Sequence, residues 1–303
     1  MKKILMLALC MLMIVTVCVS AQAATATQTG TGVTVIKAAD WAETYPDVYA
    51  SYEKNAENKD IIDHVEEYPM IATVYEGMAF NKFYGSARGH YYTVQDVTST
   101  GRPHALANCF TCKTPDFTVK VNNEGVSAYQ IPFEDMLAEV NESVSCYNCH
   151  ANTGNELVVT HTYLYDAMGE DFASLNAKTA SCAQCHVEYY FDPETKAVTL
   201  PYGSKAALPP DAILAYYDEM GFADYTNPRT GVAQIKVQHP EFETYMGAGS
   251  VHGATFTCAD CHMEKAVNDA GESYVSHTWM SPLASESITA TCSACHADLK
   301  GFV

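Results

Sequence analysis

The chain has 303 residues and a strong acidic excess, with 36 Asp and Glu against 17 Lys and Arg and a formal net charge of -19. Hydrophobic residues make up 48% of the sequence, which excludes a disordered chain and a membrane-embedded one. No basic face of any size is present, which excludes nucleic acid as a partner and also docking on anionic lipid through a polybasic patch.

The N-terminus has the organisation of a secretory signal peptide over residues 1–23. A short cationic start precedes an uncharged apolar run over 4–19, and an Ala-Gln-Ala cleavage site ends the segment. Cys10 and Cys18 are interpreted as apolar filler, because neither follows the small residue that a lipoprotein signal would have. We therefore predict export to the periplasm, or otherwise to the outer side of the cytoplasmic membrane.

Residues 24–303 are interpreted as one domain, because no Gly/Ser linker or break in composition divides them. Helical periodicity marks 132–140 and 211–220, and 197–200 fits a short strand. These signals predict a mainly α, loop-rich fold with little β structure.

Ten cysteines follow the signal peptide, and all of them fall in C-x-x-C pairs. A redox-active disulfide is usually a single pair, so five copies are unexpected. Zinc ribbons combine two pairs per metal and would leave one pair over. The third chemistry that uses this spacing is covalent haem attachment. The pairs are Cys109/Cys112, Cys146/Cys149, Cys182/Cys185, Cys258/Cys261 and Cys292/Cys295.

The residue after each pair favours haem. His150, His186, His262 and His296 directly follow four of the pairs, which gives four copies of the c-type haem attachment signature. Two thiols three residues apart can form thioethers with the two haem vinyl groups, and the adjacent imidazole reaches the iron from the same side. The core would then be built around covalent haems.

The first pair differs, because Lys113 follows Cys112. One interpretation is a degenerate pair without haem, or a haem whose axial ligand lies elsewhere. The other is an amine-ligated haem. A lysine amine has an unperturbed pKa of about 10.4 and must lose its proton to coordinate iron, so such a haem would serve a different purpose from its neighbours.

The histidines outside these motifs supply candidate second axial ligands. Four bis-His haems and one open haem would need four more protein ligands, and seven histidines are available for them. Saturated bis-His iron carries electrons without binding substrate, so four such haems beside an open one predict a multi-electron reductase or oxidase. The seven are His64, His90, His104, His161, His239, His252 and His277.

Three further segments make the chain resemble the ammonia-forming pentahaem cytochrome c nitrite reductases. They are the C-A-Q-C-H-V-E-Y-Y-F run at 182–191, the K-V-Q-H-P-E segment at 236–241 and the R-G-H sequence at 88–90. Together with the C-x-x-C-K motif they occur in the family's order over roughly 45–298. The resemblance implies a mainly α multihaem cytochrome c fold with five covalent c-type haems.

The resemblance also implies roles for individual residues. Lys113 would be the proximal ligand of the catalytic haem, and Arg102, Tyr189 and His239 would form its distal pocket. Distal iron ligands of three other haems would come from three histidines. These are His90 for the Cys182/Cys185 haem, His277 for the Cys146/Cys149 haem and His252 for the Cys292/Cys295 haem.

A calcium site beside the catalytic haem is likewise implied by the resemblance. Its ligands would be the Glu188 carboxylate, the Tyr189 and Lys236 carbonyls and the Gln238 amide oxygen. An all-oxygen shell of this kind suits Ca²⁺. Lys236 would act through its backbone, so its side chain predicts nothing.

The implied function is six-electron reduction of nitrite to ammonium. Nitrite is an anion in an acidic protein, so Arg102, a protonated His239 and Ca²⁺ would have to supply a local positive field. Tyr189 and His239 could donate protons as N–O bonds break. Structural alternatives remain open: His239 could cap the turn before Pro240, and Arg102 could pair only with a haem propionate.

The sequence departs from the family at its C-terminus. The family continues into helices that form most of a homodimer interface and supply the distal histidine of the fourth haem, whereas this chain stops at Val303. The Cys258/Cys261 haem therefore lacks an obvious distal ligand. Either His64, His104 or His161 substitutes, or the haem is five-coordinate, or the chain is a fragment, which is the interpretation we favour.

Two other functions stay open. A pentahaem electron carrier without a substrate site would need a sixth ligand on every iron, and a related enzyme could act on hydroxylamine or a sulfur oxyanion. The resemblance implies a membrane-bound quinol-oxidising cytochrome or a soluble multihaem protein as the electron donor.

Overall fold

The computed structural model describes residues 24, 33–78, 85–101, 103–247 and 250–302. The predicted signal peptide at 1–23 lies outside these residues, as does Arg102. Among the described residues, no helix is both long enough and apolar enough to cross a membrane.

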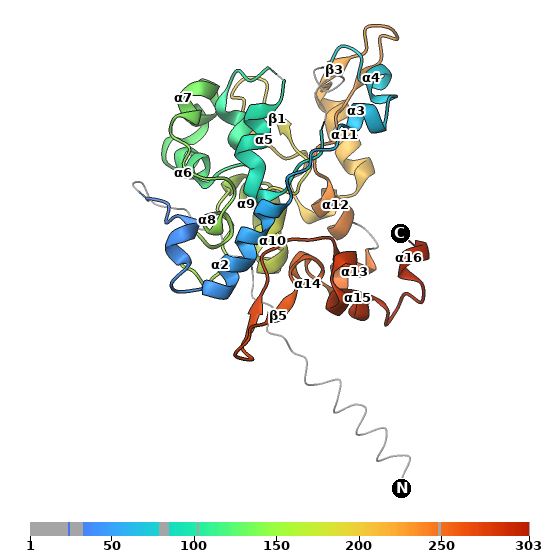
Figure 1. The fold of residues 1–303 in the computed structure, drawn as a ribbon. Helices are drawn as coiled ribbons and strands as arrows, with labels where there is room; N and C mark the ends of the chain where they lie inside the picture. The colour runs from blue at the N-terminus through green and yellow to red at the C-terminus, as the bar shows by residue number, and fades with distance from the viewer. Residues whose placement is uncertain (1–23, 25–32, 79–84, 102, 248–249, 303) are drawn as a thin grey trace.

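Short helices joined by loops make up most of the fold, as the sequence predicts (Figure 1). The α-helices are α2 (Pro46–Glu53), α3 (His64–Glu67), α4 (Ile71–Val74), α5 (Thr93–Ser99), α6 (Pro115–Glu124), α7 (Phe133–Leu137), α8 (Cys146–His150), α9 (Thr162–Met168), α10 (Ala177–Ala183), α11 (Pro210–Met220), α12 (Glu241–Met246), α13 (Val251–Thr255), α14 (Cys258–His262), α15 (Glu286–Cys292) and α16 (Leu299–Phe302). The 3-10 helices are η1 (Ala38–Trp41), η2 (Lys54–Glu57), η4 (His90–Tyr92), η5 (Ala107–Phe110), η6 (Gly125–Gln130), η7 (Gly169–Ser174), η8 (Lys205–Ala207) and η9 (Pro282–Ala284).

The strands form three small antiparallel pairs and no larger sheet within the described residues. In register, Tyr190 pairs with Thr199, Tyr225 with Gln234 and Lys265 with Val275. The strands are β1 (Tyr190–Phe191), β2 (Val198–Thr199), β3 (Tyr225–Thr226), β4 (Ala233–Gln234), β5 (Lys265–Val267) and β6 (Ser273–Val275). The predicted strand at 197–200 and helices at 132–140 and 211–220 are confirmed as β2, α7 and α11, with α7 shorter than predicted.

Local sequence explains where many of these helices begin and end. The Thr257 hydroxyl and the Asp260 carboxylate form a reciprocal capping box at α14, so this haem motif starts on a preformed helical turn. Ser145 and Asn148 do the same at α8. Gly221 ends α11 in the left-handed conformation (φ +62°), which a glycine adopts without steric cost.

The hydrophobic core lies almost entirely between residues 107 and 208. Phe110, Phe117, Met136 and Leu164 are among its fully buried side chains. In contrast, Ile288 is the only hydrophobic residue beyond position 250 that is buried among the described residues. The C-terminal part of the chain therefore has few buried hydrophobic side chains of its own. This is expected of a segment that folds around haem.

Contacts between distant segments bring the N-terminal helix α2 against the hairpin β5–β6. The His277 backbone N–H donates to the Ser51 hydroxyl at 2.9 Å, and the Asn55 amide donates to the His277 carbonyl at 2.8 Å. These bonds fix His277 immediately after the hairpin, although it lies more than 220 residues from α2.

Candidate functional site

All five cysteine pairs lie on helical turns, and none of the ten thiols forms a disulfide. The second and fourth motifs occupy α8 and α14, the first begins inside η5, and the third and fifth begin at the ends of α10 and α15. A single helical turn places both thiols of a pair on one side of the backbone, since residues three apart are neighbours on a helix surface. This arrangement fits two thioether bonds to one haem.

The fifth pair lies outside the core, and Cys295 is its more exposed member. This thiol is exposed, whereas the other nine are half-buried. Cys292 ends α15, and Cys295 lies in the turn that follows, where its backbone N–H donates to the Cys292 carbonyl at 3.1 Å. The physical reason is that side chains alone do not cover this turn, since Ile288 supplies the one buried hydrophobic side chain beyond position 250 of the described chain. A haem attached through Cys295 would therefore stand at the surface of the described residues.

The motif on α10 stands at the centre of the five. Its helix packs against both α8 and α14. The Cys185 thiol interacts with the thiol of Cys112, and the Cys182 thiol with that of Cys258. Cys149 approaches the Ser181 carbonyl at 4.0 Å. Groups attached to these pairs would therefore be close neighbours, which suits transfer of electrons between them.

A buried hydrogen-bond network holds the second and third motifs together. The Gln184 side-chain oxygen Oε1 accepts from the backbone N–H groups of Thr160 and His161 at 2.8 and 3.1 Å. Its amide donates to the Asn148 carbonyl at 2.7 Å. Gln184 and Asn148 are the variable residues of their C-x-x-C-H motifs. The sequence does not reveal that these two residues join the motifs, because no neighbouring residue indicates which distant groups their side chains contact.

Three predicted pairs of axial histidines face one another across similar distances. Ring centroids are 6.1 Å apart for His90 and His186, 6.3 Å for His150 and His277, and 6.0 Å for His252 and His296. An imidazole nitrogen lies about 1.1 Å from its ring centre and about 2 Å from a metal that it ligates. Two imidazoles sharing one metal ion should therefore have centroids roughly 6 Å apart, as observed here.

Backbone carbonyls fix the tautomer of several of these imidazoles. Nδ1 of His150 contacts the Glu156 carbonyl at 2.9 Å, and Nδ1 of His277 contacts the Val275 carbonyl at 2.9 Å. Since a carbonyl only accepts, each Nδ1 carries the proton and leaves Nε2 as the free electron-pair donor. Burial lowers the pKa of both rings, which favours the neutral form that binds metal.

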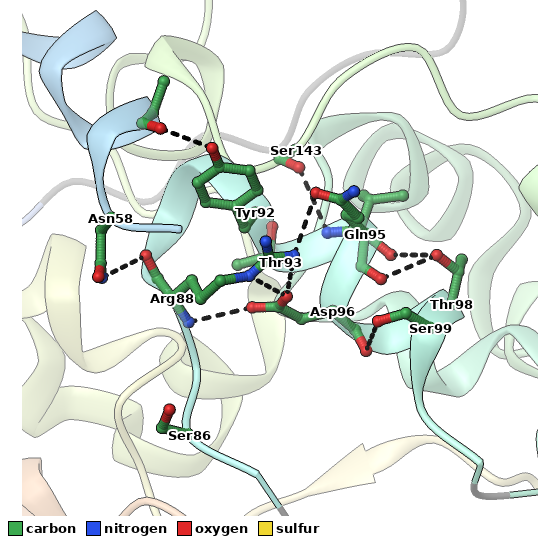
Figure 2. A network of polar contacts seen from close by, with 12 residues as sticks. Asn58, Ser86, Arg88, Tyr92, Thr93, Gln95, Asp96, Thr98, Ser99 and Ser143 are labelled. Atoms are coloured by element: carbon green, nitrogen blue, oxygen red, sulfur yellow. Dashed lines mark hydrogen bonds and ion pairs between the residues drawn. The ribbon is translucent and has the colours of Figure 1, made fainter. Parts of the chain in front are cut away.

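An ion-paired arginine positions His90. The Arg88 guanidinium contacts the Asp96 carboxylate at 2.5 and 2.7 Å and the Gln95 side-chain oxygen at 3.1 Å (Figure 2). The guanidinium carbon Cζ of Arg88 also lies 4.1 Å from the centroid of the Tyr92 ring. Gly89 follows with φ +93°, a conformation that side chains other than hydrogen disfavour. This turn presents His90, whose pKa is lowered to about 3 by desolvation and by nearby His186 and Lys113.

The first cysteine pair gathers the residues predicted for the substrate pocket. Lys113 is half-buried and its carbonyl accepts from the Thr93 hydroxyl at 2.7 Å. Tyr189 lies close enough to both thiols of the pair that they help burial to raise its pKa. His239 also interacts electrostatically with Cys112. The structure thus brings these predicted residues together, whereas Arg102 lies outside the described residues.

Sequence reasoning missed Glu241, which lies between two functional histidines. Its carboxylate is 3.8 Å from Nδ1 of His186 and 3.7 Å from Nδ1 of His239. The ligand atoms of these three residues all lie within 4.8 Å of one another. Burial alone would raise the pKa of Glu241, but the two imidazoles lower it below its ordinary range. The carboxylate is therefore ionised and can orient both rings.

The four predicted calcium ligands come from two segments that meet in space. Glu188 is 3% exposed, and its carboxylate accepts from the Tyr217 hydroxyl at 3.0 Å and from the Gln238 N–H at 2.6 Å. The Gln238 amide oxygen accepts from the Lys236 ammonium. Tyr189 directly follows Glu188 in the chain. The Glu188 carboxylate thus meets the segment that carries the Gln238 amide oxygen, and oxygens of these kinds are donors that Ca²⁺ prefers.

Two further carboxylates surround this cluster and carry no sequence signal. Asp224 accepts from the Lys236 N–H at 2.6 Å, and Glu243 accepts from the Glu188 N–H at 3.1 Å. Desolvation raises the pKa of Glu188 and of Asp224, the Asp224 charge raises the pKa of Glu188 further, and the Glu188 charge raises that of Glu243. A bound cation would relieve this repulsion.

The three histidines considered as distal ligands of the Cys258/Cys261 haem have contacts elsewhere. His161 is 3% exposed, stacks on Tyr163 and lies 3.5 Å from the Thr118 hydroxyl. His104 stacks on Phe133, with centroids 4.6 Å apart. His64 lies 3.8 Å from Glu67 in α3. His262 itself contacts the Met280 carbonyl through Nδ1 at 3.3 Å.

These residues fit c-type haem as a cofactor. Ten thiols lie in pairs without disulfides, three imidazole pairs are spaced for a shared metal, and one buried ring nitrogen of His90 has no hydrogen-bond partner in the described part of the chain. A zinc ribbon would instead need two cysteine pairs per ion and no facing histidines.

The comparisons with known proteins agree with this chemistry. The sequence matches the cytochrome c552 family over residues 37–302. A similar solved structure is the cytochrome c nitrite reductase of Desulfovibrio desulfuricans, a catalytic subunit with two calcium sites. It shares 28% sequence identity and superimposes with a TM-score of 0.72 over 91% of this chain, which spans 66% of that protein's chain. The chain therefore belongs to the cytochrome c552 family.

Proposed function

We propose that the protein reduces nitrite to ammonium at a haem attached to Cys109 and Cys112, with Lys113 as the proximal ligand. The observation that carries this proposal is the arrangement around that pair. It is the one C-x-x-C pair without a following histidine, and Tyr189 and His239 gather against it. Membership of the cytochrome c552 family and the likeness to a nitrite reductase support the same reaction.

The other four cysteine pairs would hold the haems that deliver electrons. Their proposed axial pairs are His90 with His186, His150 with His277, and His252 with His296, with His262 as the proximal ligand of the remaining haem. When bound, the haems supply the electrons and an iron to which nitrite can bind. The central place of the α10 motif among the pairs supports delivery through Cys182/Cys185 to the Cys109/Cys112 site.

The exposed position of Cys295 suits the entry of electrons. A haem held by Cys292 and Cys295 would be open to an external donor, because the second thiol of this pair is exposed. The facing rings of His252 and His296 support attachment at this pair despite its place outside the core.

Lys113 has to act as a neutral amine, because an ammonium group has no electron pair for iron. The Thr93 hydroxyl anchors the Lys113 carbonyl and so fixes the segment from which the side chain extends.

His239 and Tyr189 would deliver protons to the substrate. The Glu241 carboxylate lies 3.7 Å from Nδ1 of His239, which would leave Nε2 to contact substrate. The Tyr189 hydroxyl has a raised pKa, so it remains protonated and can donate a hydrogen bond. Arg102 is proposed as the third pocket residue and would attract the nitrite anion.

We further propose a Ca²⁺ ion held by Glu188, the Tyr189 and Lys236 carbonyls and the Gln238 amide oxygen. A cation there would take the Gln238 oxygen from the Lys236 ammonium. Because His239 directly follows Gln238, the ion would also fix the segment that carries this histidine. Its charge would add to the positive field that holds an anionic substrate.

The remaining parts of the proposal concern the protein's surroundings. The signal peptide predicted over residues 1–23 would direct it to the outer side of the cytoplasmic membrane. A quinol-oxidising membrane cytochrome or a soluble multihaem protein would then be the donor. A homodimer is what the family resemblance implies, although the helices that form most of its interface are not part of this sequence.

The test is nitrite-dependent oxidation of a reduced viologen by the haem-loaded protein, with ammonium measured in the same reaction. We expect ammonium to form in proportion to the viologen oxidised. A protein that carries all five haems, exchanges electrons with viologen and forms no ammonium would contradict the proposal and favour an electron carrier. Parallel reactions with hydroxylamine and sulfite would show whether either is the better substrate.

A further inference from the structure

Trp279 packs between two histidines that serve different haems in the proposed ligand set. Its indole lies 4.5 Å from the His90 ring, at an interplanar angle of 71°, and 5.6 Å from the His277 ring, at 76°. Both contacts are edge-to-face, a favourable geometry for aromatic rings. One side chain therefore contacts the proposed distal ligands of the Cys182/Cys185 haem and of the Cys146/Cys149 haem.

The surroundings hold Trp279 in an unfavourable backbone conformation. Its φ is +45°, which is a genuine outlier for a bulky residue. Tyr52 contacts the indole from a third side at 6.0 Å, and the Tyr52 hydroxyl donates to the Val144 carbonyl at 3.2 Å, just before the second haem motif. Strain of this kind persists where the neighbouring structure imposes it, and it concentrates at functional positions.

The short segment around Trp279 also reaches a third haem motif. The Met280 carbonyl lies 3.3 Å from Nδ1 of His262, while His277 itself is tied to Ser51 and Asn55. Residues 277–280 therefore connect groups assigned to three haems, and Trp279 is the member of this segment that contacts two imidazole faces.

We propose that Trp279 is a positioning residue that sets the ring planes of His90 and His277, and through them the electronic properties of both haems. This inference rests on the proposed axial ligands. An imidazole bound to iron through one nitrogen can still rotate about that bond, so contacts beyond the metal decide its plane. His277 has a second fixed point in the Val275 carbonyl, whereas His90 depends more strongly on the indole.

The ring planes give this proposal a spectroscopic signature. The angle between the rings is 64° for His90 and His186, 38° for His150 and His277, and 33° for His252 and His296. In low-spin ferric haems, a larger angle between axial imidazole planes gives a larger maximum g-value. Ligand orientation is also one of the means by which a protein adjusts haem potential.

The experiment is low-temperature EPR and a potentiometric titration of the haem-loaded Trp279→Leu variant. We expect changed g-values and shifted midpoint potentials for the two haems that Trp279 contacts, and an unchanged signal for the His252/His296 haem. Trp279→Phe, which retains an aromatic ring, should give smaller shifts. Trp41→Leu is the matched control, because Trp41 is the only other tryptophan and packs on Tyr45.

Unchanged g-values and potentials in Trp279→Leu would overturn the proposal, and so would equal shifts in every low-spin signal, which would indicate general loosening. If the leucine variant does not load haem, Trp279→Phe decides by the same criterion. A His277→Ala variant tests the ligand set separately, since it should convert one low-spin haem to high spin. None of these measurements uses nitrite, so failure of the proposed activity would be distinguishable.

Discussion

Glu243 gives a quantitative prediction about stability and pH. Its side chain is 2% exposed and accepts from the Glu188 N–H at 3.1 Å. Burial raises its pKa to about 7, and the Tyr202 hydroxyl and the Glu188 N–H oppose this only in part. We propose the substitution Glu243→Gln, because glutamine has the same size and keeps an oxygen for the Glu188 N–H but cannot ionise.

The direction of the pH effect on stability follows from the proton affinities of Glu243 in the folded and unfolded states. The folded protein binds this proton more tightly than the unfolded chain, whose glutamate pKa is about 4.3. Stability linked to Glu243 is therefore fully present below that value and is lost as the pH rises through about 7. The loss amounts to about 4 kcal/mol in the free energy of unfolding, at 1.36 kcal/mol per pH unit.

The assay is thermal unfolding followed by circular dichroism at pH 5 and at pH 8.5. At the higher pH, Glu243→Gln should be more stable than the natural protein by about 4 kcal/mol, or about 6 °C in melting temperature for a chain of this size. At pH 5 the two should agree within about 1 kcal/mol. Glu194→Gln, at an exposed position, is the matched control. An identical pH dependence for the natural protein and Glu243→Gln would refute this reasoning.

Three further substitutions test the site. Lys113→Ala should lower nitrite turnover by about 10- to 100-fold, as the loss of a group at a metal site does. The visible spectra of the other haems should persist. Unchanged turnover would contradict the assignment of Lys113 as an iron ligand. Glu188→Gln should weaken Ca²⁺ binding about 10- to 100-fold in a titration, and an unaltered affinity would argue against the proposed site. Arg88→Lys cannot reproduce the two guanidinium contacts with Asp96 and should lower the free energy of unfolding by about 2 kcal/mol. Part of the Cys182/Cys185 haem should then become high spin in EPR. A fully low-spin signal would show that the arginine does not position His90.

Local chemistry made the haem motifs and several elements predictable from the sequence. A C-x-x-C-H run carries its own geometry, because thiols and imidazole are fixed by one helical turn. Helix α11 was predictable for a similar reason, since its apolar residues recur with helical spacing and Gly221 ends it. The short strand β2 was also recognisable, although its two residues pair only with β1.

Residues that act through distant contacts were not predictable. Asp224 lies twelve residues from Lys236 in sequence, and its carboxylate reaches the Lys236 N–H only when β3 and β4 pair. Gln184 occupies a variable motif position, and Trp279 meets His90 from the far end of the chain. The exposure of Cys295 has the same origin, because its motif reads like the others and only packing decides how far each pair is covered. Only the folded chain brings these residues to their surroundings, so no single-sequence pattern marks them.

The proposed reduction of nitrite to ammonium at the Lys113 haem can be tested by one direct measurement. Isotopically labelled nitrite is supplied to the haem-loaded protein with reduced viologen, and labelled ammonium and electrons consumed are counted together. We predict one ammonium and six electrons per nitrite, because the nitrogen changes its oxidation state from +3 to -3. Release of a partly reduced nitrogen oxide with fewer electrons, or no nitrite consumption at all, would contradict this account.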